Sequence, residues 1–373
     1  YIGRLWFARR DLLTSSDKSF LNNGEFLEHD LLKEAAGNTE HVSHIPMVLY
    51  SRRNPGRPRM TLLTDPPDAS SRLTKRNIAP VGAVAPLVSV IIPTCLSDLG
   101  IVEKCLISLF ERTAYDNLEV ILVVNNVADT EASRAFLSRW PARILHWESP
   151  FNWSAINNYG AGGASGEYLL FMNDDVEVIG RDWLSSMVRA ANFPKVGAVG
   201  ATLRYPNGTL QHTGVFLVPH GGGAIHAFRY YTGLEPELTQ LLAYDHECTA
   251  VTGACLLTKA TIFHSLGGFD EALSLVCNDV DYCVRLHTND YRCLVAANTE
   301  LIHHEGISRA GIPETEDVRL FHKRWGHLLE RGDPYMNPNL VVMRADWVVN
   351  PEATGSLIGR RSGGIGAIDI ATT

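Results

Sequence analysis

The sequence GEYLLFMNDDVEV, residues 166–178, runs an apolar segment directly into two adjacent aspartates, Asp174 and Asp175. Neighbouring carboxylates repel each other, and close to a dry core they are costly unless a positive group lies between them. Mg²⁺ and Mn²⁺ prefer oxygen ligands and commonly use one or two protein carboxylates together with substrate phosphates. The motif therefore predicts a divalent-cation site at the end of a strand. The alternative is a turn in which an aspartate caps the backbone, which is the commoner outcome for an isolated motif of this kind.

Two further segments carry side chains that suit the same chemistry. Asp279 and Asp281 begin the segment DVDYCVRL, whose apolar residues recur at helical spacing. Asp279 is then either a helix N-cap or a general base at the start of that helix. The segment HHEGISR places His303 and His304 after a strand-like run, and neutral imidazole often completes a metal site. Together with the acidic pair, these residues favour proton transfer next to a bound cation.

The segments around these residues alternate between strand and helix patterns. Continuous apolar runs at 87–94 and 118–126 predict strands that are buried on both faces, and apolar residues at helical spacing predict a helix over 100–113. A further helix and a short strand over 142–147 follow. This order indicates an α/β domain whose central sheet is mainly parallel and flanked by helices.

Polar residues stand at the ends of three predicted strands. Ligands of parallel sheets lie at the carboxyl ends of the strands, so these residues are expected to line one crevice. They are Pro93 and Thr94 after the first strand, Asn125 and Asn126 after the second, and Asn173, Asp174 and Asp175 after the third.

The second half of the chain predicts a strand over 250–259 and helices over 259–271 and 279–290. The segment HGGGAIHAF, residues 220–228, is predicted to be either a flexible loop beside a substrate or a phosphate cradle. It lacks the strand–GxGxxG–helix setting of a dinucleotide site. His212 and His226 are candidates for contact with a substrate, and for each a structural role is the alternative.

The composition is that of an ordinary globular protein, with 373 residues, 45% hydrophobic and 20% charged. The formal net charge of −8 and the absence of a basic block exclude a nucleic-acid surface. No apolar run approaches the roughly 20 residues of a membrane span. The seven cysteines are odd in number and include no Cys-x-x-Cys pair, which favours reduced thiols in a cytoplasmic protein.

The chain is expected to contain parts of two domains. Residues 51–86 are rich in proline, arginine and glycine and are predicted to be a linker. Residues 1–50 loosely repeat the closing pattern of the main domain, and because the chain begins with Tyr1 they are interpreted as the tail of a preceding, similar domain in a longer chain. An unrelated helical extension is the alternative. Residues 87–330 are then the main domain and 331–373 a C-terminal extension.

Six segments, in this order, resemble the family 2 glycosyltransferases of the GT-A fold, in particular bacterial enzymes of O-antigen and other surface-polysaccharide assembly such as rhamnosyltransferases. The resemblance covers roughly residues 85 to 325 and implies a Rossmann-like nucleotide-binding half and an acceptor-binding half. The segments are VSVIIPT, EVILVVNN, FNWSAINNYGAGGASGEYLLFMNDDVEV, GAVGATLRYPNGTLQHTGV, GGFDEALSLVCNDVDYCVRL and ELIHHEGISR.

The resemblance also implies roles for individual residues. Asp175 and His303 would hold Mg²⁺ or Mn²⁺ on the donor diphosphate, and Asp279 would be the catalytic base. Asn125 stands where relatives often have an aspartate that contacts the base, which leaves the identity of the nucleotide open. The residues expected to bind the donor are Pro93, Thr94, Asn125, Asn126, Asn158, Asn173 and Asp174, and those on the acceptor side are Asp281, His212 and His226.

The expected function is an inverting, metal-dependent transfer of a sugar from a UDP-, GDP- or dTDP-sugar to a saccharide or lipid-linked saccharide. The enzyme is expected in the cytoplasm, with peripheral association at the inner face of the membrane. One alternative is a non-catalytic sugar- or nucleotide-binding domain. Another is a nucleotidyltransferase, which usually has a basic, glycine-rich loop after its first strand; here the segment PTCLSDLG contains no basic residue.

Overall fold

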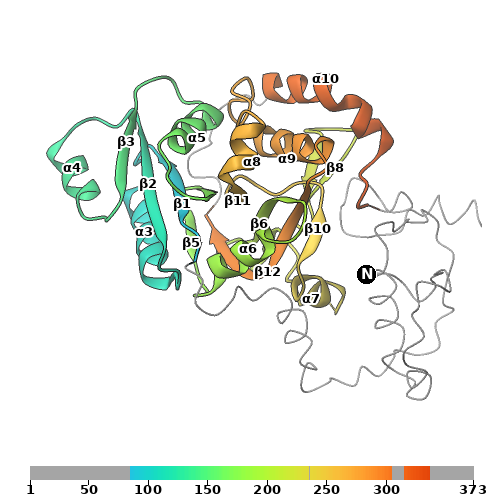
Figure 1. The fold of residues 1–373 in the computed structure, drawn as a ribbon, viewed down its shortest axis with the longest axis horizontal. Coiled ribbons are helices and arrows are strands. Elements are labelled where there is room, and N and C mark those ends of the chain that lie inside the picture. Colours follow the sequence, from blue (N-terminus) through green and yellow to red (C-terminus); the bar gives the residue numbers. More distant parts are fainter. Residues whose placement is uncertain (1–84, 235, 305–314, 337–373) are drawn as a thin grey trace, which may run out of the picture. The chain divides into compact units, whose positions relative to one another are not determined.

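The computed structural model describes residues 85–234, 236–304 and 315–336. In this part of the chain, helices cover both faces of one large β-sheet (Figure 1). The predicted tail of a preceding domain, nearly all of the predicted linker and most of the predicted C-terminal extension lie outside the described residues. None of the helices in the described ranges combines the length and apolar character that crossing a membrane requires.

The large sheet has ten strands in the described residues, eight of which follow the order β10-β12-β6-β11-β4-β1-β2-β3. Beside this path β5 pairs with β12 and β7 with β6, and β8 and β9 form a separate two-stranded sheet. The strands span Val88–Thr94 (β1), Leu118–Asn125 (β2), Arg143–Trp147 (β3), Tyr168–Met172 (β4), Val176–Val178 (β5), Val196–Arg204 (β6), Leu210–His212 (β7), Val215–Leu217 (β8), Ala224–His226 (β9), His246–Cys248 (β10), Cys255–Lys259 (β11) and Arg292–His303 (β12).

Strand direction divides the sheet into two parts. β4, β1, β2 and β3 are parallel neighbours, as the first half of the sequence predicts. β11 then runs antiparallel to both β4 and β6, while β12 is parallel to β6. The α/β class with a large central sheet is confirmed, and the sheet is parallel in its first part and mixed in its second.

The helices fall into two layers. α3, α4 and α6 contribute to the core on one face of the sheet, and α5, α8, α9 and α10 to the core on the other. The strands supply both cores by alternation, so Val90 and Ile92 face one layer and Ile91 the other. The helices span Leu99–Arg112 (α3), Glu131–Leu137 (α4), Trp153–Gly162 (α5), Trp183–Ala191 (α6), Pro236–Leu242 (α7), Ala260–Ser265 (α8), Asn278–Thr288 (α9) and Thr315–Arg331 (α10).

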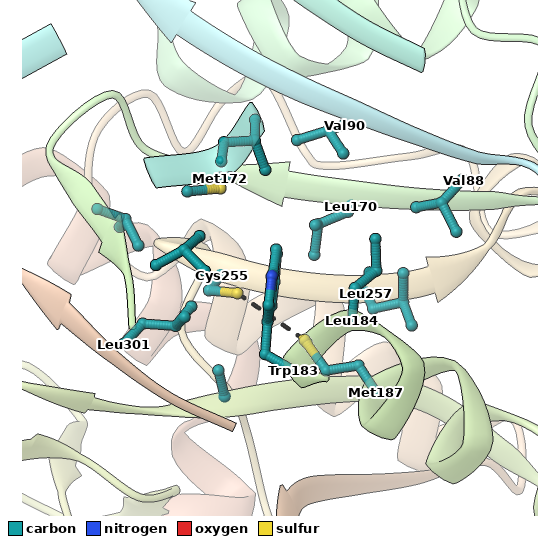
Figure 2. Close-up of a cluster of buried hydrophobic side chains, with 14 of the residues drawn as sticks. Val88, Val90, Leu170, Met172, Trp183, Leu184, Met187, Cys255, Leu257 and Leu301 are labelled. Atoms are coloured by element: carbon teal, nitrogen blue, oxygen red, sulfur yellow. Dashed lines mark hydrogen bonds between the residues drawn. The ribbon is translucent and has the colours of Figure 1, made fainter. Parts of the chain in front are cut away.

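Trp183 of α6 anchors the first core against the middle of the sheet. Its ring is fully buried beside Leu170 and Leu257 (Figure 2). Its indole N–H donates to Thr113 Oγ1 at 3.1 Å. Met187, one turn further along α6, places its sulfur 4.0 Å from that of Cys255. Full burial of one such side chain contributes about 1.5–3 kcal/mol, so this contact fixes α6 beneath the strands.

α5 lies unusually close to the first strands because Gly160 has no side chain. A Cβ at this position would come within 2.5 Å of Ile91 Cγ2 and 2.9 Å of Val123 Cγ2. The helix begins after Asn152, whose side chain accepts a hydrogen bond from the backbone N–H of Ala155. The close approach therefore sets the place of Trp153, the first residue of α5.

Two predicted elements are shorter than expected, and both differences shape the site. The helix predicted over 259–271 ends at Ser265 because Gly267 and Gly268 adopt φ values of +76° and +74°, which a helix does not allow. The strand predicted over 250–259 begins only at Cys255. The residues before it, 252–254, form part of the site described below.

A buried carboxylate joins α9 to α10. Asp281 is fully buried and accepts hydrogen bonds from Arg285 Nε at 2.8 Å, Arg324 Nη1 at 2.6 Å and Trp325 Nε1 at 2.8 Å. Arg324 also pairs with Asp270 in the segment after α8. Because a buried charge is stable only while its partners remain, this network fixes α9 relative to its neighbours.

We expect Asp281→Ala to lower the free energy of unfolding by about 3–5 kcal/mol, because the change leaves two guanidinium groups without a buried partner. The matched control is Asp290→Ala, which removes an exposed ion pair with Lys195 and should cost at most about 1 kcal/mol. Urea denaturation followed by tryptophan fluorescence measures both. Equal losses in the two variants would contradict the structural role assigned to Asp281.

Candidate active site

The polar strand ends lie at one edge of the sheet, as predicted, because β4, β1 and β2 are parallel neighbours. Thr94 at the end of β1 makes a side-chain hydrogen bond to the carboxylate of Asp174. Burial, together with the charge of Asp175, nevertheless raises the pKa of Asp174 to about 6. The acidic pair is therefore electrostatically strained near neutral pH, and a nearby cation would relieve that strain.

His303, the last residue of β12, lies against Asp175. The antiparallel pairing of β12 with β5 sets His303 opposite Val176, and the backbone N–H of His304 donates to the carbonyl of Asp175 at 3.0 Å. His303 Nε2 is then 3.1 Å from Asp175 Oδ1. Both side chains are buried. The structure thus brings together the two residues that the sequence assigned to a cation site.

Gln211 of β7 fixes which ring nitrogen of His303 carries the proton. The Gln211 side-chain N–H donates to the His303 carbonyl at 3.4 Å, so its oxygen is the atom 2.6 Å from His303 Nδ1 and accepts from it. His303 Nε2 therefore presents a lone pair toward Asp175 Oδ1. Two such atoms 3.1 Å apart repel unless a proton or a cation bridges them.

The residues fit a divalent cation on these grounds. A carboxylate oxygen and an imidazole nitrogen with its tautomer set by a neighbouring amide are suitable ligands for Mn²⁺ or Mg²⁺. Among the described residues, no group of three His, Cys, Asp or Glu side chains is arranged to hold a metal. Magnesium sites commonly complete their coordination with substrate phosphates and water.

Asp279 lies in the first turn of α9 and is tied to the acidic strand end through the residues before β11. Its Oδ2 accepts a hydrogen bond of 2.7 Å from the N–H of Gly253. The next carbonyl, of Ala254, accepts one of 3.1 Å from the N–H of Asn173. A Cβ on Gly253 would lie 2.5 Å from the ring of Trp153, so only glycine fits this turn.

A cavity of about 240 Å³ lies between four of these segments. Asn173 lines it from the acidic strand end, Trp153 from α5, Asp279 from α9 and His226 from β9. The Trp153 indole N–H donates to Asn173 Oδ1 at 3.3 Å, which orients that amide. The volume is below the roughly 300–1,000 Å³ of pockets that hold whole drug-sized ligands, so it suits one end of a larger substrate.

The asparagines expected to bind the donor use their side chains partly to hold loops. Asn125 and Asn126 both donate from Nδ2 to the carbonyl of Ser149, at 3.2 and 3.3 Å, and thereby fix the segment after β3. Asn158 donates to the Phe269 carbonyl at 2.9 Å and accepts from the Phe269 N–H at 2.9 Å. Through this reciprocal pairing Asn158 anchors the turn after α8.

The three residues expected on the acceptor side have different positions. His226 lines the cavity. His212 is fully buried and contacts His226 through their Nδ1 atoms. Asp281 is fully buried within the network that joins α9 to α10, so its carboxylate is not available to an acceptor and its role is structural.

Two residues of the site do not stand out in the sequence as parts of it. Gln211 carries no signal of its own beside His212, and Gly253 falls inside the strand predicted over 250–259. Trp153 can be expected either to pack in the core or to stack on a sugar, and the sequence favours the core. Trp153 does pack in the core against Phe269, with ring centroids 5.0 Å apart, but it also borders the cavity.

Comparisons with known proteins show what this chain is similar to. Residues 89–256 match the family described as Glycosyl transferase family 2. The chain is 35% identical over 347 residues to the O-antigen biosynthesis protein RfbC of Myxococcus xanthus, an alignment that covers 85% of this chain and 27% of that protein. It is 25% identical over 214 residues to an N-acetylglucosaminyl-diphospho-decaprenol L-rhamnosyltransferase of Mycobacterium tuberculosis, covering 52% of this chain and 69% of that enzyme.

Among solved structures, GalNAc-T7 with UDP, GalNAc and Mn²⁺ is similar to this chain with a TM-score of 0.54 and 13% identity, covering 64% of this chain and 48% of that one. At this identity the likeness shows the fold, and the fold is GT-A. The chain spans only about a quarter of the length of the O-antigen biosynthesis protein RfbC.

We expect Gln211→Leu to lower the affinity for Mn²⁺ by about 10- to 100-fold, because His303 loses the acceptor that fixes its tautomer. Calorimetric titration of Mn²⁺ into the purified chain measures this. His246→Gln is the control, since His246 is a half-buried histidine on β10 whose ring contacts Thr213. Unchanged affinity in the Gln211 variant would show that His303 does not depend on this contact.

Proposed function

We propose that this chain is an inverting, divalent-metal-dependent glycosyltransferase. Its match to glycosyl transferase family 2 and its GT-A fold are the starting point of the proposal. The proposed enzyme moves a sugar from a nucleotide-sugar donor to a saccharide or lipid-linked saccharide acceptor in surface-polysaccharide synthesis. The names of two relatives, an O-antigen biosynthesis protein and a rhamnosyltransferase of a diphospho-decaprenol substrate, support this substrate class. A lipid-linked acceptor also supports a cytoplasmic enzyme at the inner face of the membrane.

The acidic strand end forms the donor side of the proposed site. Asp175 and His303 are the protein ligands of the cation, and Asp174 lies beside them with Thr94. The cation, when bound, supplies Lewis-acid stabilisation of the negative charge that develops on the leaving diphosphate. Pro93 and Asn125 lie in the last two residues of β1 and β2, Asn126 follows β2, and in this proposal all three border the nucleotide.

Asp279 is the proposed base. It takes the proton of an acceptor hydroxyl while that oxygen bonds to the anomeric carbon and the bond from this carbon to the nucleoside diphosphate breaks. A single displacement of this kind inverts the anomeric configuration. The position of Asp279 in the first turn of α9 favours a negative charge there by about 0.3–1 kcal/mol, and the Gly253 N–H fixes the direction of the carboxylate.

One observation carries the proposal. Asp279 and Asn173 border the same cavity, and the turn before β11 bonds to both, through the N–H of Gly253 and the carbonyl of Ala254. A base and a cation-binding strand end are thus held by one short segment at fixed relative positions. Such an arrangement suits a displacement in which the base and the leaving group act at the same sugar carbon.

The donor side is tested with a panel of UDP-, GDP- and dTDP-sugars incubated with Mn²⁺ or Mg²⁺. We expect slow, metal-dependent release of one nucleoside diphosphate. Asp175→Asn should abolish the metal dependence and weaken Mn²⁺ binding by at least roughly 100-fold, because the site loses a charged ligand. Asp129→Asn, at an exposed position, is the control. Release of pyrophosphate from nucleoside triphosphates would instead indicate a nucleotidyltransferase.

The base is tested with Asp279→Asn. The amide oxygen of the new side chain can still accept from Gly253, so the donor should bind nearly as before, while kcat falls by about 10²- to 10⁴-fold. Donor affinity by calorimetry and transfer rate at saturating acceptor are the two measurements, with Asp290→Asn as the isosteric control. Transfer within a few-fold of the unmodified chain would assign Asp279 to helix capping alone.

A further inference from the structure

Two histidines on short strands of different sheets form a pair beside the cavity. His212, at the end of β7, and His226, at the end of β9, have their Nδ1 atoms 3.0 Å apart and their rings at 79°. His212 is fully buried, whereas His226 lines the cavity that contains Asp279. A core residue thus contacts a cavity residue directly.

The surroundings of His212 decide which of the two rings donates. A contact between two neutral imidazoles through Nδ1 needs one proton on one Nδ1 atom. His212 Nε2 is buried over Gly200, whose Cβ position would be 3.5 Å away, and it has no hydrogen-bond partner among the described residues. A proton on that nitrogen would be an orphaned N–H in the core, which is rarer than an under-satisfied acceptor.

The proton of His212 is therefore on Nδ1, and His212 donates to His226. Burial lowers the pKa of His212 well below its usual value, in keeping with a neutral donor ring. His226 Nδ1 is then the acceptor, so the proton of neutral His226 is on Nε2. The antiparallel pairing of His226 with Val215 holds its backbone in place at the edge of the cavity.

We propose that His226 contacts the acceptor sugar, donating its Nε2–H to a hydroxyl oxygen next to the hydroxyl that reacts at Asp279, and that His212 is the positioning residue that keeps this tautomer. The inference rests on the proposed function. The carboxylate of Asp279 receives a proton from one hydroxyl, and the N–H of His226 donates to the adjacent hydroxyl. Together the two groups distinguish two adjacent hydroxyls of one sugar. The pair thereby selects the position on the acceptor that is glycosylated.

The tautomers are measured first, without any reaction. Long-range ¹⁵N–¹H spectra of the full chain, labelled at its 14 histidines and assigned by single substitutions, report which ring nitrogen carries the proton. We expect Nδ1–H in His212 and Nε2–H in His226. In His212→Leu the His226 signals should shift to a mixture of tautomers, whereas in His246→Gln they should not change. A proton on Nδ1 of His226 in the unmodified chain would overturn the inference.

The contact with the acceptor is measured on the reaction that the donor panel identifies. His226→Leu should raise the acceptor KM by about three- to tenfold, with donor affinity unchanged. His226→Gln, which places an N–H donor near the position of Nε2, should restore most of that loss. An unchanged acceptor KM and unchanged product linkage in His226→Leu would overturn the proposed contact while transfer itself remained. Failure of the unmodified chain to use any donor would count against the proposed function, and the tautomer result would still stand or fall by itself.

Discussion

The repulsion between Asp174 and Asp175 is the constraint on which this edge of the molecule depends. A buried strand can end in two carboxylates only where other groups offset their charge. Thr94 of β1 bonds to one of them and His303 of β12 lies against the other, so two strands that are far apart in the sequence both serve the end of β4. Burial and, to a lesser extent, the charge of Asp175 nevertheless raise the pKa of Asp174 to about 6. In the proposed site a bound cation would offset the remaining charge.

The antiparallel strand in the mixed part of the sheet links this acidic strand end to Asp279. β11 runs antiparallel to β4, so it begins beside the point where β4 ends. The turn that leads into β11 therefore lies between the acidic strand end and α9. In this turn the N–H of Gly253 donates a hydrogen bond to Asp279, and the carbonyl of Ala254 accepts one from the N–H of Asn173. In a wholly parallel sheet the neighbouring strand would begin at the opposite edge, and no such turn would reach both groups.

The sequence predicts those features of the site that short segments determine. It does not predict contacts that depend on the pairing of strands far apart in the chain. The polar strand ends, the helix that bears Asp279 and the meeting of Asp175 with His303 follow from local patterns and from the family resemblance. Gln211 could not be found in this way, because it is 92 residues from His303 and reaches it only through the pairing of β7 with β6 and β6 with β12.

Asn158 is a related case, in which the sequence suggested a different role. Its amide bonds to Phe269, 111 residues away, only because two left-handed glycines end α8 early. Asp281, by contrast, had a readable signal in the sequence, since Arg285 follows it at i+4 on the same helix face.

β7 supports both sides of the site through two adjacent residues. Neighbouring side chains of a strand point to opposite faces, so Gln211 reaches His303 and His212 reaches His226. Gln211 contacts Nδ1 of His303, and His212 contacts Nδ1 of His226, but the hydrogen bonds have opposite directions. Gln211 accepts the hydrogen bond from His303 and so leaves a lone pair on Nε2 of that ring, whereas in the inference above His212 donates the hydrogen bond and leaves an N–H on Nε2 of His226. A lone pair suits a cation and an N–H suits a hydroxyl oxygen, so in the proposed site the order glutamine then histidine in β7 separates the metal side from the sugar side.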